Sequence, residues 1–160
     1  MACMVVALVT VIASPAAAAA APLRESASLD SGVLVGLNQI RVAHGLKPVK
    51  PNRQLTAAAR QHSGDMAQKG YFGHTSSDGT PFWKRIERLY VKNQVNHFGS
   101  VGENLIESTG PLTAAGALDA WMASPLHRAN ILYPGWRDIG ISAVTAAATT
   151  YITTDFGVRR

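Results

Sequence analysis

Residues 138–156, DIGISAVTAAATTYITTDF, decide the class of fold that this chain can adopt. Two runs rich in apolar and β-branched residues, 138–145 and 150–156, flank a short link over 146–149. β-branched and aromatic residues favour strands, and two strands joined by so short a link pair side by side in opposite directions. We therefore predict an antiparallel β-hairpin over this stretch.

The chain before the hairpin carries apolar residues at helical spacing, with one short strand-like segment, Leu105-Ile106, at the end of a loop that starts at Gly99. The order of helices, strand, helix and strands predicts an α+β fold in which helices cover a small antiparallel sheet. The expected helices run from Asp30 or Ser31 to His44-Gly45, from Asn52 to Gly70, from Thr80-Pro81 through Leu89, from Thr113 to Met122, and from Pro125 to Leu132.

An uncharged segment opens the sequence. Residues 1–21 contain no acidic or basic side chain, and the mainly apolar run 4–13 is followed by Ser14-Pro15 and by alanines that suit signal-peptide cleavage. The run is shorter than the roughly 20 apolar residues that cross a bilayer. We predict a signal peptide over 1–21, a short linker over 22–29 and one domain over 30–160. The alternative for the first segment is an alanine-rich structural helix.

The composition narrows the class of protein. Of the 160 residues, 47% are hydrophobic and 16% are charged, which is typical of one folded domain and excludes disorder, collagen and coiled coil for most of the chain. The single cysteine, Cys3, excludes an intramolecular disulfide framework and a cysteine-based zinc finger. The net charge of +5 comes from scattered basic residues, which favours weak attraction to anionic envelope polymers over nucleic-acid binding.

Two of the five histidines, His74 and His127, stand in loops rich in turn residues. Glu103 lies next to apolar strand residues, where a buried carboxylate needs a partner. Two imidazoles and a carboxylate form a common catalytic-type zinc set with one open position. His74, Glu103 and His127 are therefore the candidate catalytic or metal-binding residues, with Zn²⁺ or another divalent ion as candidate cofactor. The other histidines are expected at a helix end, on a buried helix stripe and in a loop: His44, His62 and His97.

Several motifs follow one another in a fixed order. They are Phe72-Gly73-His74-Thr75-Ser76, Gly102-Glu103-Asn104-Leu105 and Trp121-Met122-Ala123-Ser124-Pro125-Leu126-His127-Arg128-Ala129-Asn130-Ile131-Leu132, with Leu37-Asn38-x-x-Arg41 upstream and Thr154-Asp155-Phe156-Gly157 at the close. They resemble the motifs of the CAP superfamily, also called SCP or CRISP/antigen 5/pathogenesis-related-1, in its compact bacterial type. The resemblance extends over about residues 30–157.

This resemblance implies a three-layer α-β-α sandwich with a central cleft and a His/Glu/Glu/His tetrad. Carried over, His74 matches the first histidine, Glu103 the first glutamate and His127 the second histidine. The second glutamate would fall near Ser124, where this chain has serine, so the tetrad is incomplete and strong divalent-metal binding is less expected.

Other polar residues near these positions have a structural explanation beside a functional one. Ser124 either completes a hydrolytic triad with Glu103 and His127 or caps the helix that starts at Pro125, and we favour the cap. Asp78 either reaches the His74 site or simply belongs to an Asp-Gly turn, which we favour. Together with Asn104, Ser124 and Asp78 are the expected neighbours of the cleft.

Three functions stay open on this sequence. The first is a secreted or envelope-associated binding domain, because related CAP proteins are linked to sterol and fatty-acid binding, with the ligand in the cleft or in an apolar groove between helices. The second is a metal-assisted hydrolase that uses His74, Glu103 and His127. The third is a non-catalytic structural envelope protein. We favour binding, since the sequence lacks a nucleophile elbow and an H-E-x-x-H motif. We expect no nucleic-acid partner and no membrane span after export, and the oligomeric state stays open.

Overall fold

The computed structural model describes residues 21–91 and 100–158. Most of the predicted signal peptide, with Cys3, and the loop histidine His97 lie outside these ranges. The helices are α1 (Ala27–Ala43), α2 (Arg53–Lys69), α3 (Phe82–Ile86), α4 (Ala114–Ala123) and α5 (Pro125–Ile131), with a π-helical turn, η1 (Glu87–Val91), directly after α3. The strands are β1 (Arg24–Glu25), β2 (Lys50–Pro51), β3 (Val101–Ser108), β4 (Asp138–Ala146) and β5 (Thr149–Gly157).

The strands form one sheet with β4 and β5 at its centre. The order is β1-β4-β5-β3, all antiparallel, and β2 adds a short parallel pairing to β4. The predicted hairpin is confirmed, with a tighter link than expected because pairing continues to Ala146 and Thr149. Ala147 makes the turn in the left-handed region, with φ 51°.

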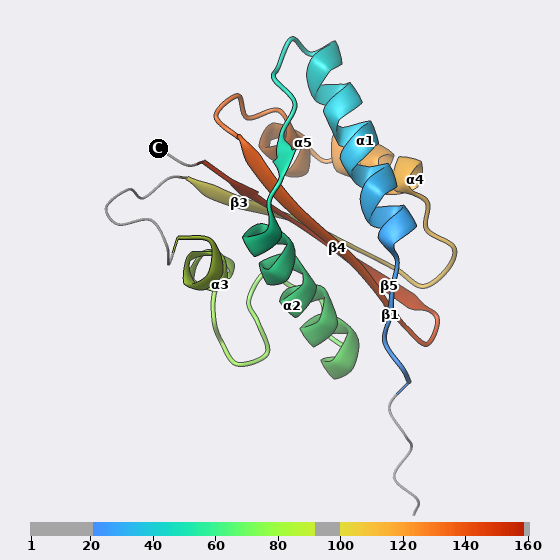
Figure 1. The fold of residues 1–160 in the computed structure, drawn as a ribbon. Coiled ribbons are helices and arrows are strands. Elements are labelled where there is room, and N and C mark those ends of the chain that lie inside the picture. Colours follow the sequence, from blue (N-terminus) through green and yellow to red (C-terminus); the bar gives the residue numbers. More distant parts are fainter. Residues whose placement is uncertain (1–20, 92–99, 159–160) are drawn as a thin grey trace, which may run out of the picture.

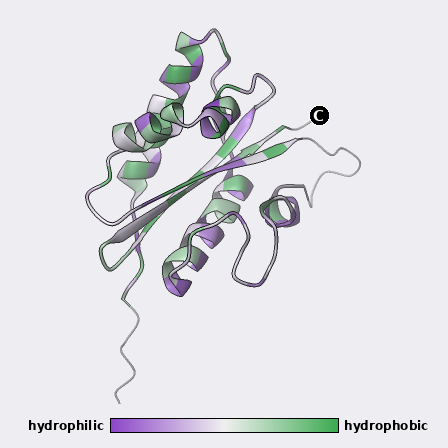
Figure 2. Cartoon of the chain, turned by 180° about the vertical axis from the view of Figure 1, so that it is seen from behind, coloured by the Kyte–Doolittle hydropathy of each residue, from purple (hydrophilic) through white to green (hydrophobic). Residues whose placement is uncertain are grey.

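Helices cover both faces of this sheet, which confirms the predicted α-β-α sandwich. Figure 1 shows α1, α4 and α5 on one side of the strands and α2 and α3 on the other. In Figure 2 the same layers are seen from behind, and most helices carry both hydrophobic and hydrophilic residues. Apolar side chains of α1, α4 and α5 pack with β4 and β5 in one core, and a smaller cluster joins α2 to α3 and η1.

The helix α2 lies directly on the backbone of β4. Its ends are as predicted: Asn52 caps the start by accepting hydrogen bonds from the amides of Gln54 and Leu55, and Gly70 ends it in the left-handed conformation. A Cβ placed on Gly140 would lie 2.0 Å from the carbonyl carbon of Leu55. Glycine is therefore required at this position for the helix to approach the sheet.

The stretch expected as a linker, 22–29, belongs to the folded domain. Arg24–Glu25 pairs with β4, and α1 begins at Ala27 with Ser26 as its N-cap. Asp30, one of the two expected caps, instead accepts a hydrogen bond from the amide of Ala143 at 2.7 Å, and burial raises its pKa to about 6. These contacts join residues more than 100 positions apart, so local sequence signals do not contain them.

Two other boundaries differ from the prediction. Pro81 is the N-cap of α3 rather than its first helical residue. The strand β3 begins at Val101, although a loop was expected before Leu105. Gly102, Glu103 and Asn104 have little strand preference of their own, but each pairs with a residue of β5, and this tertiary pairing overrides the local tendency.

Candidate functional site

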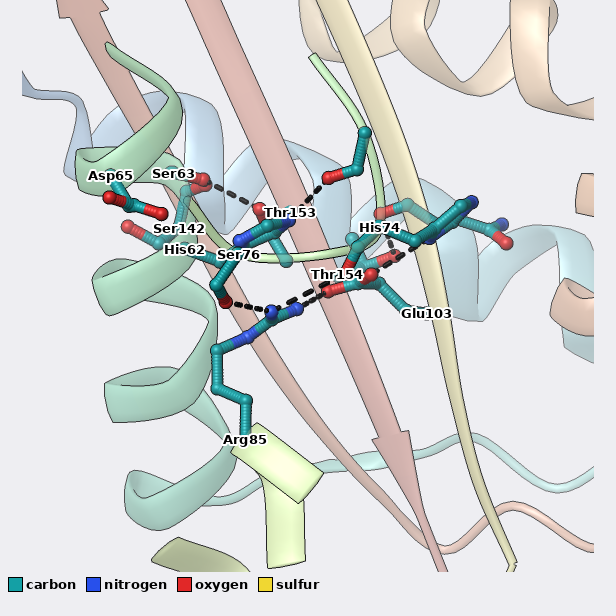
Figure 3. A network of polar contacts seen from close by, with 12 residues as sticks. His62, Ser63, Asp65, His74, Ser76, Arg85, Glu103, Ser142, Thr153 and Thr154 are labelled. Atoms are coloured by element: carbon teal, nitrogen blue, oxygen red, sulfur yellow. Dashed lines mark hydrogen bonds and ion pairs between the residues drawn. The ribbon is translucent and has the colours of Figure 1, made fainter. Parts of the chain in front are cut away.

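Glu103 is the centre of a buried network of charged groups (Figure 3). Its side chain on β3 has no exposed surface, and its Oε1 lies 2.8 Å from Nδ1 of His74. The side chain of His74 is 52% exposed, so this imidazole joins the buried carboxylate to the surface. The expectation that Glu103 needs a partner is met from the loop between α2 and α3.

Arg85 supplies the second partner of Glu103, and the sequence prediction missed it. The residue comes from α3 and is 2% exposed. One terminal nitrogen, Nη2, forms an ion pair with Oε2 of Glu103, and the other, Nη1, donates to Oγ of Ser76 at 2.8 Å. The signal available in the sequence was its position beside Ile86 on a short helix, because a buried carboxylate calls for a buried cation.

Asp155 adds a second carboxyl group to the same network. It lies directly opposite Glu103 in the β3–β5 register and is fully buried. Within the described part of the chain, no group donates a hydrogen bond to either oxygen of the ionised carboxylate. Burial raises the pKa of Asp155 well above its ordinary value, and the charge of Glu103 raises it further. The neutral acid can then donate a hydrogen bond to Glu103. In the sequence, the position of this acid between two strand-forming residues, Thr154 and Phe156, was the signal that it could be buried.

His62 holds the loop that carries His74. It lies on the inner stripe of α2, as expected, but is fully buried rather than half-buried, and its Nε2 lies 2.8 Å from the carbonyl oxygen of Gly73. Burial and, secondarily, the charge of Arg85 lower its pKa, so the ring is neutral at pH 7 and donates from Nε2. This hydrogen bond fixes the backbone next to His74.

His127 approaches from the opposite side of β3. It lies on α5, half-buried, and Asn104 donates to its carbonyl oxygen at 3.1 Å. Side chains alternate along a strand, so Asn104 faces α5 while Glu103 faces α2. Burial lowers the pKa of His127, and the charge of His74 lowers it further. The structure thus brings His74 and Glu103 into contact, and within the described residues no hydrogen bond or ion pair joins the side chain of His127 to either of them.

These residues do not fit the metal set expected from the sequence. Within residues 21–91 and 100–158, no group of three or more His, Cys, Asp or Glu side chains is placed to hold a metal ion. Both oxygens of Glu103 and the Nδ1 of His74 are already engaged, and one of the partners is a guanidinium. A three-ligand site would need these groups to be free.

Ser124 and Asp78 serve the local fold, one at the start of a helix and the other in a turn. Ser124 is the N-cap of α5 by its backbone, with Pro125 in the first turn, although its side chain makes no capping hydrogen bond. In the described residues Ser124 makes no side-chain hydrogen bond to His127 or Glu103, so no triad is formed. Asp78 accepts from the amide of Thr80 at 2.8 Å, and the following Gly79 has φ 81°, which confirms the expected turn.

A groove between α1 and α4 lies apart from this network. It encloses about 560 Å³. A Cβ on Gly32 would lie 2.8 Å from that of Ala114, and one on Gly36 would lie 2.4 Å from Cδ1 of Leu118. The two glycines therefore allow the helices to approach closely beneath the groove. Its lining consists of Ser31, Gly32, Val35, Gly36, Gln39, Ile40, Ala115, Leu118 and Asp119.

Comparison with known proteins gives relatives for nearly the whole described domain. The sequence pattern of CAP, the cysteine-rich secretory protein family, matches residues 36–156. The uncharacterized Bacillus subtilis protein YkwD is 35% identical over 112 residues, which make up 69% of this chain and 40% of that protein.

Solved structures agree with this relationship. An extracellular protein of Bacillus anthracis that contains an SCP domain is 26% identical with a TM-score of 0.68, over 82% of this chain and 41% of the other. An outer surface protein of Borrelia burgdorferi has the same fold, with a TM-score of 0.76 at 16% identity, over 88% of this chain and 99% of the other. The chain thus spans less than half of the length of the two Bacillus relatives.

Proposed function

The chain belongs to the CAP, or cysteine-rich secretory protein, family, and we propose that it acts as an exported bacterial binding domain for an apolar, lipid-like ligand. The groove between α1 and α4 is the observation that carries this proposal. Its volume of about 560 Å³ falls in the range of small-molecule sites, roughly 300–1,000 Å³.

The chemistry of the groove favours an apolar and uncharged ligand. Leu118, Ile40 and Val35 supply the apolar contact surface, and Val35 is 56% exposed. Covering such surface is favourable by about 25 cal/mol for each Å² that leaves water. The carboxylate of Asp119 lies on the lining and repels anions. We therefore expect a neutral ligand, such as a sterol, to bind better than a fatty-acid anion.

The buried network gives less support to catalysis. A hydrolase of the kind considered above needs a free carboxylate or an activated nucleophile. Glu103 is engaged by His74 and Arg85, and Ser124 lacks a bond to His127 in the described residues. A binding role for the domain needs neither of these groups to react.

The proposal that the protein is exported is supported by the uncharged first segment and by the extracellular location of related proteins. The B. anthracis and B. burgdorferi structures are described as an extracellular and an outer surface protein. Within the described residues, no helix has the length and apolar character to span a membrane. A direct test is to express the full sequence with a C-terminal tag in a Gram-positive host and determine the N-terminal residue of the exported chain, which we expect within or just after 16–21.

Ligand binding is tested with a matched pair of variants on α1. Val35 lines the groove, whereas Val42, 58% exposed on the same helix, does not. We expect saturable binding of a fluorescent sterol, weakened at least about tenfold by Val35→Glu and unchanged by Val42→Glu, which corresponds to about 1.4 kcal/mol or more. Lack of saturable binding, or equal binding by both variants, would contradict the proposal.

A further inference from the structure

The buried network contains its own permanent cation. Arg85 is almost fully buried, and its guanidinium contacts Glu103 on one side and Ser76 on the other. The guanidinium group of arginine is a permanent positive charge in proteins. In Figure 3 the guanidinium points from α3 towards the same carboxylate that His74 contacts.

We propose that Arg85 takes the place of a divalent metal at the His74–Glu103 site and keeps this site free of metal. A metal ion there would need an oxygen of Glu103, and the guanidinium already compensates that charge. The ion would also lie within a few ångströms of a fixed positive group in a poorly solvated region, where repulsion between like charges is strong.

Removal of the Arg85 guanidinium would leave the acidic groups around it without their cation. Without the guanidinium, Glu103 and Asp155 would be two adjacent buried carboxyl groups with no cation between them. His74 already contacts Glu103. Carboxylate and imidazole donors of this kind suit Zn²⁺.

The shape of the side chain matters as well as its charge. The fork of Arg85 bonds to Glu103 and Ser76 at the same time, and the loop that contains Ser76 also carries His74. The ion pair therefore fixes the position of the loop as a bound metal would. This inference concerns a different site from the α1–α4 groove and does not depend on sterol binding.

Calorimetric titration of the purified chain with Zn²⁺ tests the proposal. We expect no saturable Zn²⁺ binding at this site in the wild type, nor in Arg85→Lys, which keeps the charge. Arg85→Gln should gain saturable Zn²⁺ binding, at least about 100-fold tighter than the weakest affinity that the titration can detect, since a repelling charge is removed and its carboxylate partner is released. His74→Ala in the Arg85→Gln background should abolish this gain. Arg88→Gln removes an exposed positive charge from the neighbouring turn and serves as the control.

Two results would overturn the proposal. One is Zn²⁺ binding by the wild type that His74→Ala removes. The other is an Arg85→Gln variant that is folded by circular dichroism and gains no affinity. If Arg85→Gln is unfolded without metal, its circular dichroism with Zn²⁺ decides: recovery of the fold supports the proposal, and failure to recover contradicts it.

Discussion

At the scale of single residues, the carboxylate of Glu103 determines the roles of its neighbours. His74 and Arg85 bind its two oxygens, and Asp155 keeps its proton because it is fully buried and because a second charge next to Glu103 would be unfavourable. His62 takes no part in these bonds but holds the backbone of the loop that carries His74. One buried charge thus requires a cation from α3, a hydrogen-bond partner from the loop between α2 and α3, and a neutral acid from β5.

The buried imidazole of His62 predicts a pH dependence of stability. Its folded pKa is lowered from 6.5, so below about pH 6.5 the unfolded state takes up a proton that the folded state resists. We expect the free energy of unfolding, measured in urea, to decrease between pH 7.5 and 5.5, and to decrease less in His62→Gln. The comparison with the variant separates this effect from Asp30, whose raised pKa acts in the opposite direction. Equal pH dependence in both proteins would contradict the assignment.

At the scale of elements, the contact between α2 and β4 places the site. Gly140 lets the first turn of α2 lie on the strand, and the same helix carries His62 further along. The ends of α2 were predictable from Asn52 and Gly70, since capping signals are local. The contact between α2 and β4 was not predictable, because a glycine inside a strand indicates a close approach of backbone but does not identify the element that approaches.

Gly140→Ala should therefore be costly. The new Cβ would lie 2.0 Å from backbone of α2, which cannot move as a side-chain tip can. We expect a loss of about 1–3 kcal/mol or more in the free energy of unfolding, as for other overpacked sites. Gly110→Ala is the matched control, because a Cβ there meets no atom within 4 Å. Similar stability of the two variants would show that α2 does not rest on Gly140.

At the scale of the whole molecule, the parts that were predicted from the sequence are those with local signals. The hairpin of β4 and β5, the helices α2, α4 and α5 and the turn at Asp78-Gly79 were expected from spacing, caps and turn residues and are confirmed. His74 and Glu103 were grouped by their residue types and by resemblance to a family, and no local spacing signal joined them, since 28 residues lie between them in the sequence. Arg85 and the pairing of β1 were missed for the same physical reason: their partners are distant in the chain.

The division of the molecule into two separate features follows from its layers. The charged network lies between the sheet and the α2–α3 layer, whereas the apolar groove belongs to the α1–α4 layer on the other side (Figure 1). A ligand in the groove therefore need not contact His74 or Glu103. This separation is why we assign binding to the groove and charge compensation to the network.

The most direct test of this account is a sterol titration of the ¹⁵N-labelled chain, followed by amide chemical shifts. Cholesterol delivered from cyclodextrin should shift the amides of Gly32, Gly36 and Leu118 in a saturable manner and leave those of His74 and Glu103 unchanged. Shifts centred on His74, Glu103 and His127, or no saturable shift at all, would contradict the assignment of the ligand to the groove between α1 and α4.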